Sequence, residues 1–597
     1  MKAIILAAGY GNRMRPLTDD CHKTLLKIAD RTIIERIIDG LCANGVRDVM
    51  FVTGYRAEEL TSFLKVRYPD MPFSFVHNAR YRQTNNVYSL SLAFDQIDIN
   101  DDIMLIESDL VYDPSVIERV IRSKHANAAL VDRFRSGMDG TVVTVENQVI
   151  TNVIPPHLQG PAFDFTDKFK TLNIYKFSKA FCASTFKKLL TYYANVIDDN
   201  CYYEMILGIL IYMQRETIHA EILQGERWAE LDDPNDLSVA EFIFNHASRR
   251  PILEGAFGGF WNYDITDFCY IRNMYFPSDA MISEMRNNLS QLVGNYGSTQ
   301  ALLNRKTAYF LLCREQNVNV LNGASQIYPL IRSRFADKKV LLPSPTFGEY
   351  PRIFPNHDRY SDQIGFDRQQ IEQRCDHCEV AVFVNPNNPT GSVLPTDWIY
   401  NLAARYQDKT FLVDESYIDF SDYPSIIRLL EKNPLENVIV IKSLSKSLGM
   451  PGIRLGYVYS YNESMNEFVK ANIPIWNLNS LAEYVLEIML KHRTSIEQSY
   501  TDTIKDREAF AAALLQGDLV EKVFPSAANF ILVSLKQADL DNRDPTDVLL
   551  SKHGIFIHNA SNKFGAERKY YRFAVRLPRE NAHLAGLLNK ASLYGAC

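Results

Sequence analysis

The 597-residue sequence lacks several features that mark specialised classes of protein. No apolar run approaches the roughly 20 residues that a membrane-spanning helix needs. The nine cysteines are scattered, which fits a reducing cytosol better than a disulfide framework. Cys375 and Cys378 form a lone C-x-x-C pair without a second ligand pair at zinc-site spacing. The apolar start, residues 1–8, leads directly into a glycine turn and is interpreted as a buried strand, not a signal peptide. We therefore expect a soluble, cytoplasmic protein.

The sequence also lacks an excess of positive charge. With 64 Lys and Arg against 71 Asp and Glu, the net charge is −7, which argues against wholesale nucleic-acid binding. Small anionic substrates in local basic pockets remain compatible with this balance. The length exceeds what one hydrophobic core usually supports, so two or more domains are expected.

Two stretches of alternating strand and helix patterns make up the chain. In the first stretch, the predicted strands are 3–8, 48–53, 73–77 and 103–108, and the predicted helices are 32–43 and 57–65. This alternation predicts a mostly parallel sheet with helices on both faces. Residues 139–154 are typical of an antiparallel hairpin. The texture changes near Arg250, and no internal repeat or low-complexity linker intervenes, so we expect domains at 1–248 and 252–597.

A strand, a glycine turn and a helix open the chain, which is the general arrangement of a phosphate cradle. The string Leu6-Ala-Ala-Gly-Tyr-Gly-Asn-Arg-Met-Arg-Pro-Leu-Thr18 is followed by Lys23. Met14 stands where a dinucleotide fingerprint needs glycine, and no P-loop motif occurs. Arg13 and Lys23 can instead clamp the pyrophosphate part of a nucleoside triphosphate. The alternative interpretation is a purely structural glycine turn.

This string resembles the sugar-phosphate nucleotidyltransferase superfamily, and its phosphocholine cytidylyltransferase branch in particular. Segments 84–90, 170–178 and 228–233 support the resemblance, although His22 replaces the usual proline before the lysine. The resemblance implies Arg13 and Lys23 as catalytic residues. It implies nucleotide binding by Leu6, Ala8, Gly9, Tyr10, Gly11, Thr84 and Asn85.

The same resemblance implies a divalent cation, Mg²⁺, held by aspartates. Asp109 matches the first ligand, with a strand-end cap as the alternative, and Asp232 matches the second, with the register to Asp233 left open. Lys168 and Arg133 are candidates for the anionic head of the acceptor, or else ordinary surface charges. The reaction would be in-line attack of an anionic oxygen on the α-phosphorus of CTP, with cytidine implied by the resemblance alone.

A different set of motifs occupies the second half. Asn385-Pro-Asn-Asn-Pro-Thr-Gly391, Asp414-Glu-Ser-Tyr417 and Ser443-Leu-Ser-Lys-Ser-Leu-Gly449 follow in order. Pyridoxal 5′-phosphate (PLP) needs a lysine, a carboxylate at its ring nitrogen, a donor to O3′, a stacking ring and a phosphate nest. From about Ile252 to the C-terminus, the motifs resemble fold-type I aminotransferases, especially the histidinol-phosphate aminotransferase and threonine-phosphate decarboxylase group.

That resemblance implies a role for each matching residue. Lys446 is the Schiff-base lysine and proton shuttle, Asp414 pairs with the pyridinium, Asn388 and Tyr417 reach O3′, and Phe347 stacks on the ring. The implied phosphate-binding residues are Gly323, Ala324, Ser325, Ser443, Ser445 and Arg454, with Tyr296 reaching from the partner subunit of a homodimer.

Two arginines lie on the strand predicted near the C-terminus. Arg572 stands at the position of the family's substrate-carboxylate arginine, and Arg576 stands where many aminotransferases have glycine. Both face the same way on a strand, so two guanidinium groups could converge on one anionic head group. The alternative is that Arg576 pairs with a local acidic residue. A similar pattern in threonine-phosphate decarboxylases keeps decarboxylation open.

The fusion indicates that the product of one reaction feeds the other. 2-Aminoethylphosphonate fits both halves, because transamination of phosphonoacetaldehyde by an amino-acid donor would make it and its phosphonate oxygen could attack CTP. The whole chain resembles fused phosphonate cytidylyltransferase–2-aminoethylphosphonate transaminases. The expected fold class is α/β, with a Rossmann-like mixed sheet in the nucleotidyltransferase half and a large α/β plus small α+β domain in the aminotransferase half.

Two alternatives remain. One is a phosphocholine or phosphoethanolamine cytidylyltransferase fused to an amino-phosphate aminotransferase or decarboxylase. The other is a regulatory binding protein with a decayed domain, against which the retained Lys446, Asp414 and Asp109 argue.

Overall fold

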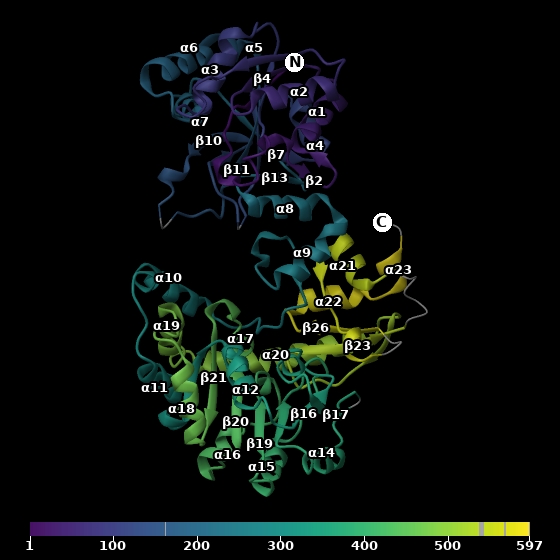
Figure 1. Ribbon diagram of the computed structural model, residues 1–597. Coiled ribbons are helices and arrows are strands. Elements are labelled where there is room, and N and C mark those ends of the chain that lie inside the picture. Colours follow the sequence, from purple (N-terminus) through teal and green to yellow (C-terminus); the bar gives the residue numbers. More distant parts are fainter. Residues whose placement is uncertain (136, 161–162, 364, 537–542, 566–568, 596–597) are drawn as a thin grey trace. The chain divides into compact units, whose positions relative to one another are not determined.

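The computed structural model describes residues 1–135, 137–160, 163–363, 365–536, 543–565 and 569–595 (Figure 1). The chain divides into two compact units, Met1–Asp264 and Ile265–Cys597. Residue Arg250, near which we placed the boundary, lies inside α9 (Arg249–Ala256). The first unit extends beyond it because the following residues still pack on that unit, with the ring of Tyr263 4.8 Å from that of Phe242.

A nine-stranded mixed sheet forms the centre of the first unit. Its order is β5 (Phe73–His77), β4 (Asp48–Thr53), β1 (Lys2–Ala7), β6 (Ile103–Glu107), β11 (Phe169–Phe177), β8 (Ala128–Arg133), β12 (His219–Ile222), β10 (Val149–Ile154) and β9 (Val142–Glu146). The first four strands are parallel, whereas β11 runs antiparallel to β6 and β8. The predicted hairpin is confirmed as the antiparallel pair β9 and β10.

Helices cover both faces of this sheet (Figure 1). One face carries α1 (Ile33–Ala43), α2 (Ala57–Arg67), α4 (Pro114–Arg122) and α8 (Pro234–Phe244), and the other carries α3 (Asn86–Gln96), α6 (Lys187–Tyr192) and α7 (Tyr203–Tyr212). Alternate residues of β1 point to opposite faces of the sheet. Ile4 and Leu6 therefore belong to the core on the side of α3, and Ile5 belongs to the core on the side of α1. Burial on both faces leaves the carboxyl ends of the strands to form a site.

Local sequence fixes where the helices begin. At α1, Thr32 Oγ1 accepts from Glu35 N at 3.2 Å, and Glu35 Oε2 accepts from Thr32 N at 2.9 Å. This capping box satisfies two backbone donors at the helix start, each of which would otherwise be unpaired. The predicted start of this helix is therefore confirmed to within one residue.

A seven-stranded sheet and a smaller antiparallel sheet build the second unit. The large sheet has the order β15 (Val318–Asn322), β21 (Leu455–Ser460), β20 (Val438–Ser443), β19 (Thr410–Asp414), β18 (Val380–Val384), β16 (Val340–Ser344) and β17 (His357–Ser361). Strands β16 to β20 are parallel, and β21 is antiparallel to both neighbours. The small sheet has the order β22 (Val520–Val523), β23 (Phe530–Leu535), β26 (Lys569–Ala574) and β25 (His558–Asn559). The predicted pairing of a large α/β domain with a small α+β domain is confirmed.

Helices pack on both faces of the large sheet. They include α11 (Gln300–Leu311), α15 (Thr396–Arg405) and α19 (Ser480–Ile488) on one core and α12 (Ile327–Arg334) and α18 (Glu463–Asn472) on the other. The long α20 (Arg493–Leu514) and α22 (Pro578–Leu587) pack with the small sheet. Along β19, Phe411 and Val413 enter one core and Leu412 the other, so this strand is buried on both faces.

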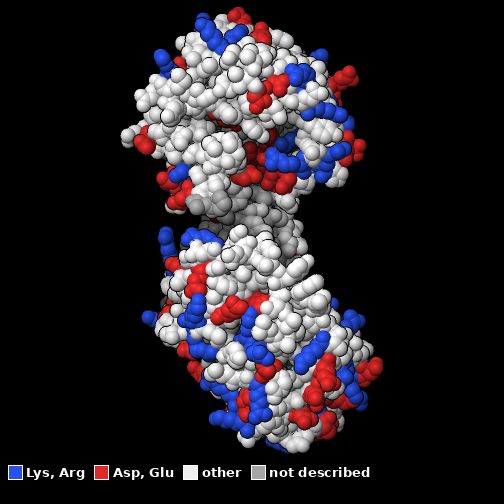
Figure 2. Space-filling model, turned by 90° about the vertical axis from the view of Figure 1, so that its left-hand side faces the viewer, with Lys and Arg blue, Asp and Glu red and all other residues white. Residues whose placement is uncertain are grey.

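Charge of neither sign dominates the visible surface. Figure 2 shows acidic and basic side chains interspersed on each unit. Among the described residues, no helix combines enough length and apolar character to cross a membrane.

Candidate active sites

The first candidate site begins at the carboxyl end of β1. Gly11 has φ 63°, a left-handed conformation that favours glycine, and a Cβ there would lie 3.3 Å from Thr18 Cγ2. Thr18 Oγ1 donates to Gly11 O at 2.9 Å and closes the turn. Leu6 and Ala8 are buried beneath it. The turn therefore exposes the backbone that follows β1, as a phosphate cradle requires.

Four predicted residues meet beside this turn. Lys23 Nζ lies 3.2 Å from Asp109 Oδ2 and 3.8 Å from Asp232 Oδ1. Arg13 NH2 lies 2.8 Å from Asp232 Oδ1, and its side chain is 67% exposed. Cationic side chains suit a triphosphate, and carboxylate oxygens are the ligands that Mg²⁺ prefers. The arrangement thus places two cations that could bind phosphate groups beside two aspartates that could bind a metal ion.

The carboxylates of the adjacent residues Asp232 and Asp233 have different partners. Asp233 Oδ1 accepts from Asn235 N at 2.6 Å and from Asp236 N at 3.3 Å, which caps α8. Asp232 instead faces Arg13 and Lys23. Because a capping carboxylate is already bonded, the geometry favours Asp232 as the ligand.

Asp232 also belongs to a group of three carboxylates that does not include Asp109. Asp139, Glu230 and Asp232 each offer an oxygen within 4.8 Å of the others, so a divalent cation fits here. Burial raises the pKa of Glu230 to about 7. We did not predict Asp139 or Glu230, although Glu230 stands two residues before Asp232, a spacing that places both on one side of an extended chain.

Sequence reasoning also missed a buried group of ionisable residues next to Asp109. Lys170 is buried and its Nζ lies 2.9 Å from Glu230 Oε2. Asn86 Nδ2 donates to Glu107 Oε1 at 3.2 Å and to Glu204 Oε2 at 3.3 Å. Burial and the charge of Asp109 raise the pKa of Glu107 well above its usual range, and burial raises that of Glu204.

Glu204 senses one nearby cation, since the charge of Lys170 partly offsets the rise in its pKa. Within the described part of the chain, neither Glu107 nor Glu204 forms an ion pair. Two buried carboxyl groups held at one amide disfavour each other's ionisation and would gain from a cation placed between them. This corner of the site is therefore suited to a positively charged group.

Other predicted nucleotide-binding residues have structural partners. Asn85 Oδ1 accepts from Asn86 N at 2.9 Å and caps α3, and Thr84 Oγ1 accepts from Asn78 Nδ2 at 3.1 Å. The ring of Tyr10 meets that of Tyr55 edge-on at 4.5 Å. These bonds order the segments on which Thr84, Asn85 and Tyr10 stand, and their contact with a base remains a prediction.

The two candidates for the acceptor's anionic head have local contacts of their own. Arg133 places its guanidinium 5.6 Å from the ring of Phe169, and Lys168 pairs with Asp167. Among the described residues, neither forms an ion pair with Asp109 or its neighbours.

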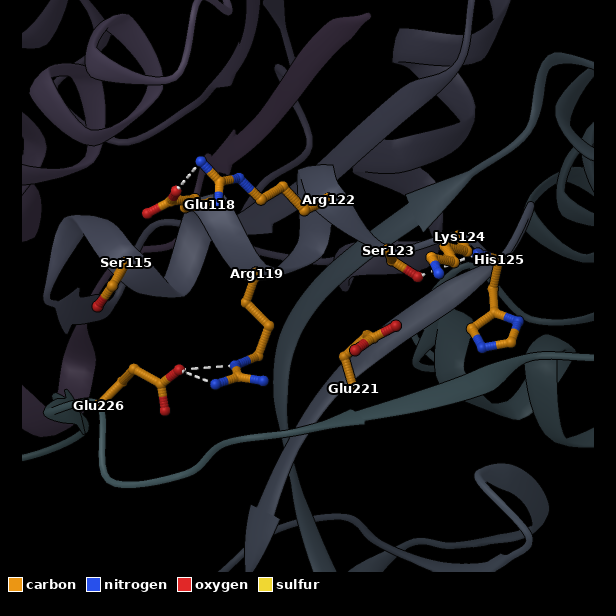
Figure 3. Close-up of a pocket in the computed structure, with 9 residues that line it drawn as sticks. All are labelled: Ser115, Glu118, Arg119, Arg122, Ser123, Lys124, His125, Glu221 and Glu226. Carbon is orange, nitrogen blue, oxygen red and sulfur yellow. Dashed lines mark hydrogen bonds and ion pairs between the residues drawn. The ribbon is translucent and has the colours of Figure 1, made fainter.

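A separate pocket of about 470 Å³ opens beside α4 and β12 (Figure 3). Four of its charged side chains are paired with one another, Arg119 with Glu226 and Arg122 with Glu118. None of the predicted site residues lines it. We therefore place the active site at the carboxylate cluster.

The second candidate site lies at the carboxyl ends of β19 and β20. Lys446 stands in the short helix α17 (Leu444–Ser447). Burial, with the charge of Arg572, lowers its pKa to about 8. Asp414, the last residue of β19, accepts from Tyr350 Oη at 2.7 Å and from Ser416 Oγ at 2.6 Å. Asp414 thus ends β19 and Lys446 follows the end of the adjacent parallel strand β20, so both lie at the same edge of the sheet, where a cofactor can be held between them.

The predicted phosphate-binding residues lie together across three strands. They are Gly323, Ala324 and Ser325 after β15, Ser443 and Ser445 at the end of β20, and Arg454 before β21. Arg454 NH2 donates to Ser325 Oγ at 3.0 Å. A Cβ on Gly323 would lie 2.3 Å from Arg454 NH2, so only glycine allows this approach.

One hydroxyl in this nest has nothing to bond. Ser445 Oγ is buried without a hydrogen-bond partner among the described residues. A buried polar group normally finds a partner, and a phosphate oxygen would supply it. The nest therefore fits the phosphate of PLP.

The residues assigned to the cofactor ring are also close to one another. Asn388 Nδ2 lies 3.5 Å from Tyr417 Oη, and Arg572 NH1 donates to Asn388 Oδ1 at 2.8 Å. Burial raises the pKa of Tyr417 to about 12. Phe347 is half-buried, with its ring 6.2 Å from that of Tyr328.

Tyr296 lies on the surface. It is 79% exposed, and its ring stacks on that of Trp476 at 4.5 Å. Its contribution to a partner's site, and the homodimer itself, remain predictions.

Arg576 does not join Arg572. Its guanidinium donates to Glu580 at 2.7 and 3.1 Å and to Asp267 O at 2.9 Å. Strand β26 ends at Ala574, so the alternation that would have aligned the two arginines stops short of Arg576. Of our two interpretations, the local acidic partner is the one seen in the structure.

Comparison with known proteins agrees with this division. Residues 3–169 match the MobA-like NTP transferase domain, and residues 264–585 match aminotransferase class I and II. The chain is 30% identical over 547 residues to CMP-5′-(3-aminopropyl)phosphonate synthase of Streptomyces rubellomurinus (strain ATCC 31215). The matched region covers 90% of this chain and 86% of that protein.

Two further similarities concern the second half. L-Serine phosphate decarboxylase of Sulfurospirillum multivorans is 28% identical over 362 residues, covering 56% of this chain and 91% of that protein. The solved L-threonine-O-3-phosphate decarboxylase from Porphyromonas gingivalis is 25% identical with a TM-score of 0.49, covering 54% of this chain and 98% of that chain. From the two family matches and the similarity that spans both halves, the chain belongs to the enzymes that fuse a MobA-like NTP transferase domain to a PLP-dependent aminotransferase class I and II domain.

Proposed function

We propose that the protein makes and activates an aminoalkylphosphonate. The C-terminal site would convert phosphonoacetaldehyde and an amino-acid donor into 2-aminoethylphosphonate. The N-terminal site would transfer CMP from CTP to its phosphonate oxygen and release pyrophosphate. A relative named as a CMP-phosphonate synthase spans both halves of the chain, which supports a product of this class. The observation that carries the proposal is the meeting of Lys23, Asp109 and Asp232 in the first site.

In the N-terminal reaction, the protein's part is positioning and charge neutralisation. Lys23 and Arg13 would bind the triphosphate and stabilise the charge that develops as the α-phosphorus exchanges its bond to pyrophosphate for a bond to the phosphonate oxygen. Mg²⁺, held by Asp109 and Asp232 with Glu230 nearby, would add charge neutralisation. No covalent enzyme intermediate is needed.

The acceptor's amine has a complementary place. Glu107 and Glu204 are buried beside Asp109 and form no ion pair among the described residues. An ammonium group between them would offset the cost of holding two carboxylates in a poorly solvated corner. This supports an acceptor that carries an anion at one end and a cation at the other, as 2-aminoethylphosphonate does.

In the C-terminal reaction, PLP would supply an electron sink. Lys446, with a pKa of about 8, can take up and return a proton at the substrate's carbon near neutral pH. Asp414 would hold the proton on the pyridine nitrogen, and Arg572 would bind the donor's carboxylate.

Decarboxylation is a second candidate for the C-terminal reaction. A relative named as an L-serine phosphate decarboxylase shares this half of the chain at 28% identity. Another, whose name is putative threonine-phosphate decarboxylase, shares it at 30% identity. A decarboxylase acting on a phosphono amino acid would also yield an aminoalkylphosphonate, with carbon dioxide as the second product.

A substrate panel tests the proposal. Purified protein receives CTP and Mg²⁺ with 2-aminoethylphosphonate, phosphocholine or phosphoethanolamine, and pyrophosphate release is followed. We expect the phosphonate to react fastest, and a preference for phosphocholine would contradict the proposal. In a second assay, phosphonoacetaldehyde with L-alanine should yield 2-aminoethylphosphonate, whereas release of carbon dioxide from a phosphono amino acid would favour the decarboxylase.

A further inference from the structure

Two cationic side chains, the buried Arg572 and the half-buried Lys563, form no ion pair among the described residues. Arg572, 8% exposed on β26, donates to Asn388 Oδ1 and to Cys269 O, and its Nε has no hydrogen-bond partner among the described residues. Lys563 donates from Nζ to Thr346 O at 2.8 Å. Within the described residues, no carboxylate forms an ion pair with Arg572 or Lys563.

Backbone pairing brings these cations to the same side of the cofactor site. Strand β25 pairs with β26 so that His558 stands opposite Arg572, and Lys563 ends the short turn Ser561–Lys563 that follows β25. Lys563 contacts Thr346, which directly precedes the predicted stacking residue Phe347. Arg572 contacts Asn388, a predicted ligand of O3′. Arg572 therefore contacts a predicted cofactor residue, and Lys563 contacts the residue directly before one.

The positive charges of Arg572 and Lys563 also affect the pKa values of neighbouring groups. Burial, followed by the charge of Arg572, lowers the pKa of Lys563 to about 8. Burial and the charges of Arg572 and Lys563 lower the pKa of His558 far below its usual value, so this imidazole stays neutral and adds no third charge. An excess of positive charge held this way is costly unless an anion binds.

Arg576 shows the contrast. Glu580 satisfies its guanidinium with two hydrogen bonds, so Arg576 has no need of a ligand. Lys563, and not Arg576, is therefore the candidate for a second free cation beside Arg572. An arginine fork can bind a carboxylate or a phosphonate with two hydrogen bonds, and the ammonium group of lysine donates to either as a point charge. Because the family resemblance places Arg572 at the substrate carboxylate, Lys563 is left as the group for a second oxyanion.

We propose that Lys563 is a specificity-determining residue of the C-terminal site and that its ammonium group binds the phosphonate of the substrate. Arg572 binds the carboxylate of an amino-acid substrate. In transamination, donor and phosphonate occupy the pocket in turn, and in decarboxylation both anionic groups belong to one substrate. The inference rests on the proposed phosphonate substrate and assigns the group that recognises it.

The test compares two matched ligands on the PLP-loaded full-length enzyme. 2-Aminoethylphosphonate and β-alanine share the amine and the two-carbon chain and differ in the anion. Their apparent affinities are measured from the change in cofactor absorbance on titration. The variants are Lys563→Gln, Lys563→Arg and, as a control, Lys522→Gln, which alters an exposed lysine of the same small sheet.

In the wild type, we expect a preference for the phosphonate over β-alanine. Lys563→Gln should reduce that preference ~10- to 100-fold, the effect of removing one partner of a buried charge pair. Lys563→Arg should restore most of it, and Lys522→Gln should retain it. Retained cofactor absorbance in each variant shows that the pocket is folded.

The outcomes separate this inference from the function on which it rests. A wild-type enzyme without preference for the phosphonate would contradict the proposed function and the inference with it. A wild-type preference that survives in Lys563→Gln would overturn the inference alone. An equal loss of affinity for both ligands would assign Lys563 a structural role and would overturn it too.

Discussion

Lys23 Nζ lies 3.2 Å from Asp109 Oδ2, although 86 residues separate them in sequence. The lysine follows the glycine turn after β1, and the aspartate follows β6, the neighbouring parallel strand. Because parallel neighbours end at the same edge of a sheet, two motifs distant in sequence build one site. Lys23 therefore stands beside Asp109, the residue that we propose as a metal ligand, where its ammonium group can bind a triphosphate.

Removing Lys23 should abolish most CMP transfer. We expect Lys23→Ala to lower kcat for pyrophosphate release by ~100- to 1,000-fold, the usual cost of losing one group that stabilises developing charge. The exposed Lys27 offers a control, and Lys27→Ala should keep the wild-type rate. A near-normal rate in Lys23→Ala would remove this residue from the mechanism.

The adjacent aspartates should respond differently to the same change. Asp232→Asn should raise the Mg²⁺ concentration needed for half-maximal pyrophosphate release, because a neutral amide binds the ion more weakly. Asp233→Asn should leave the Mg²⁺ requirement unchanged, since asparagine caps a helix about as well as aspartate. If Asp233→Asn were the variant with the altered Mg²⁺ titration, the second ligand would be Asp233.

Glu204 should select acceptors that carry an amine. We expect Glu204→Gln to raise KM for 2-aminoethylphosphonate by ~10-fold, as expected when one charge of a buried pair is lost. KM for ethylphosphonate, which has no amine, should change little. Steady-state pyrophosphate release with both acceptors measures the two values. An equal rise for both acceptors would mean that Glu204 supports the fold and not the amine.

Attachment of PLP to cofactor-free enzyme should depend on pH. Burial lowers the pKa of Lys446 to about 8, so the neutral amine, which is the nucleophile, becomes the major form as pH rises through that value. The rate at which the yellow colour of lysine-bound PLP appears should increase over this range and level off above it. A rate still rising far above pH 8 would show that Lys446 has an ordinary pKa.

The variant Lys446→Ala should lack the yellow colour of lysine-bound PLP. The same variant should retain CMP transfer when 2-aminoethylphosphonate is supplied, because the residues of the first site all lie in the first compact unit. Loss of both activities would indicate that the variant fails to fold.

Local patterns were enough to predict several elements of the fold. The apolar runs at β1, β4 and β5 and the period of α1 matched the structure closely, because each depends on neighbours a few residues away. The catalytic motifs were equally readable, since Lys446 and Asp414 sit in short strings whose residue types suit only a few chemistries.

Pairings over long distances were not readable in this way. Asn86 meets Glu204 across 118 residues, and Lys563 meets Thr346 across 217. The sequence does not distinguish a charged residue that forms an ion pair within the protein from one that binds a ligand. Arg576, for which the sequence left both interpretations open, illustrates the first case. We propose that Lys563 illustrates the second.

The sequence by itself determined the two families, the order of the domains and the motif residues, because these depend on residue type and local spacing. Only the tertiary structure decided which charges are neutralised within the protein and which are left for a substrate. That choice depends on burial and on contacts between strands far apart in the chain, and the free energy of an unpaired charge is set by those surroundings.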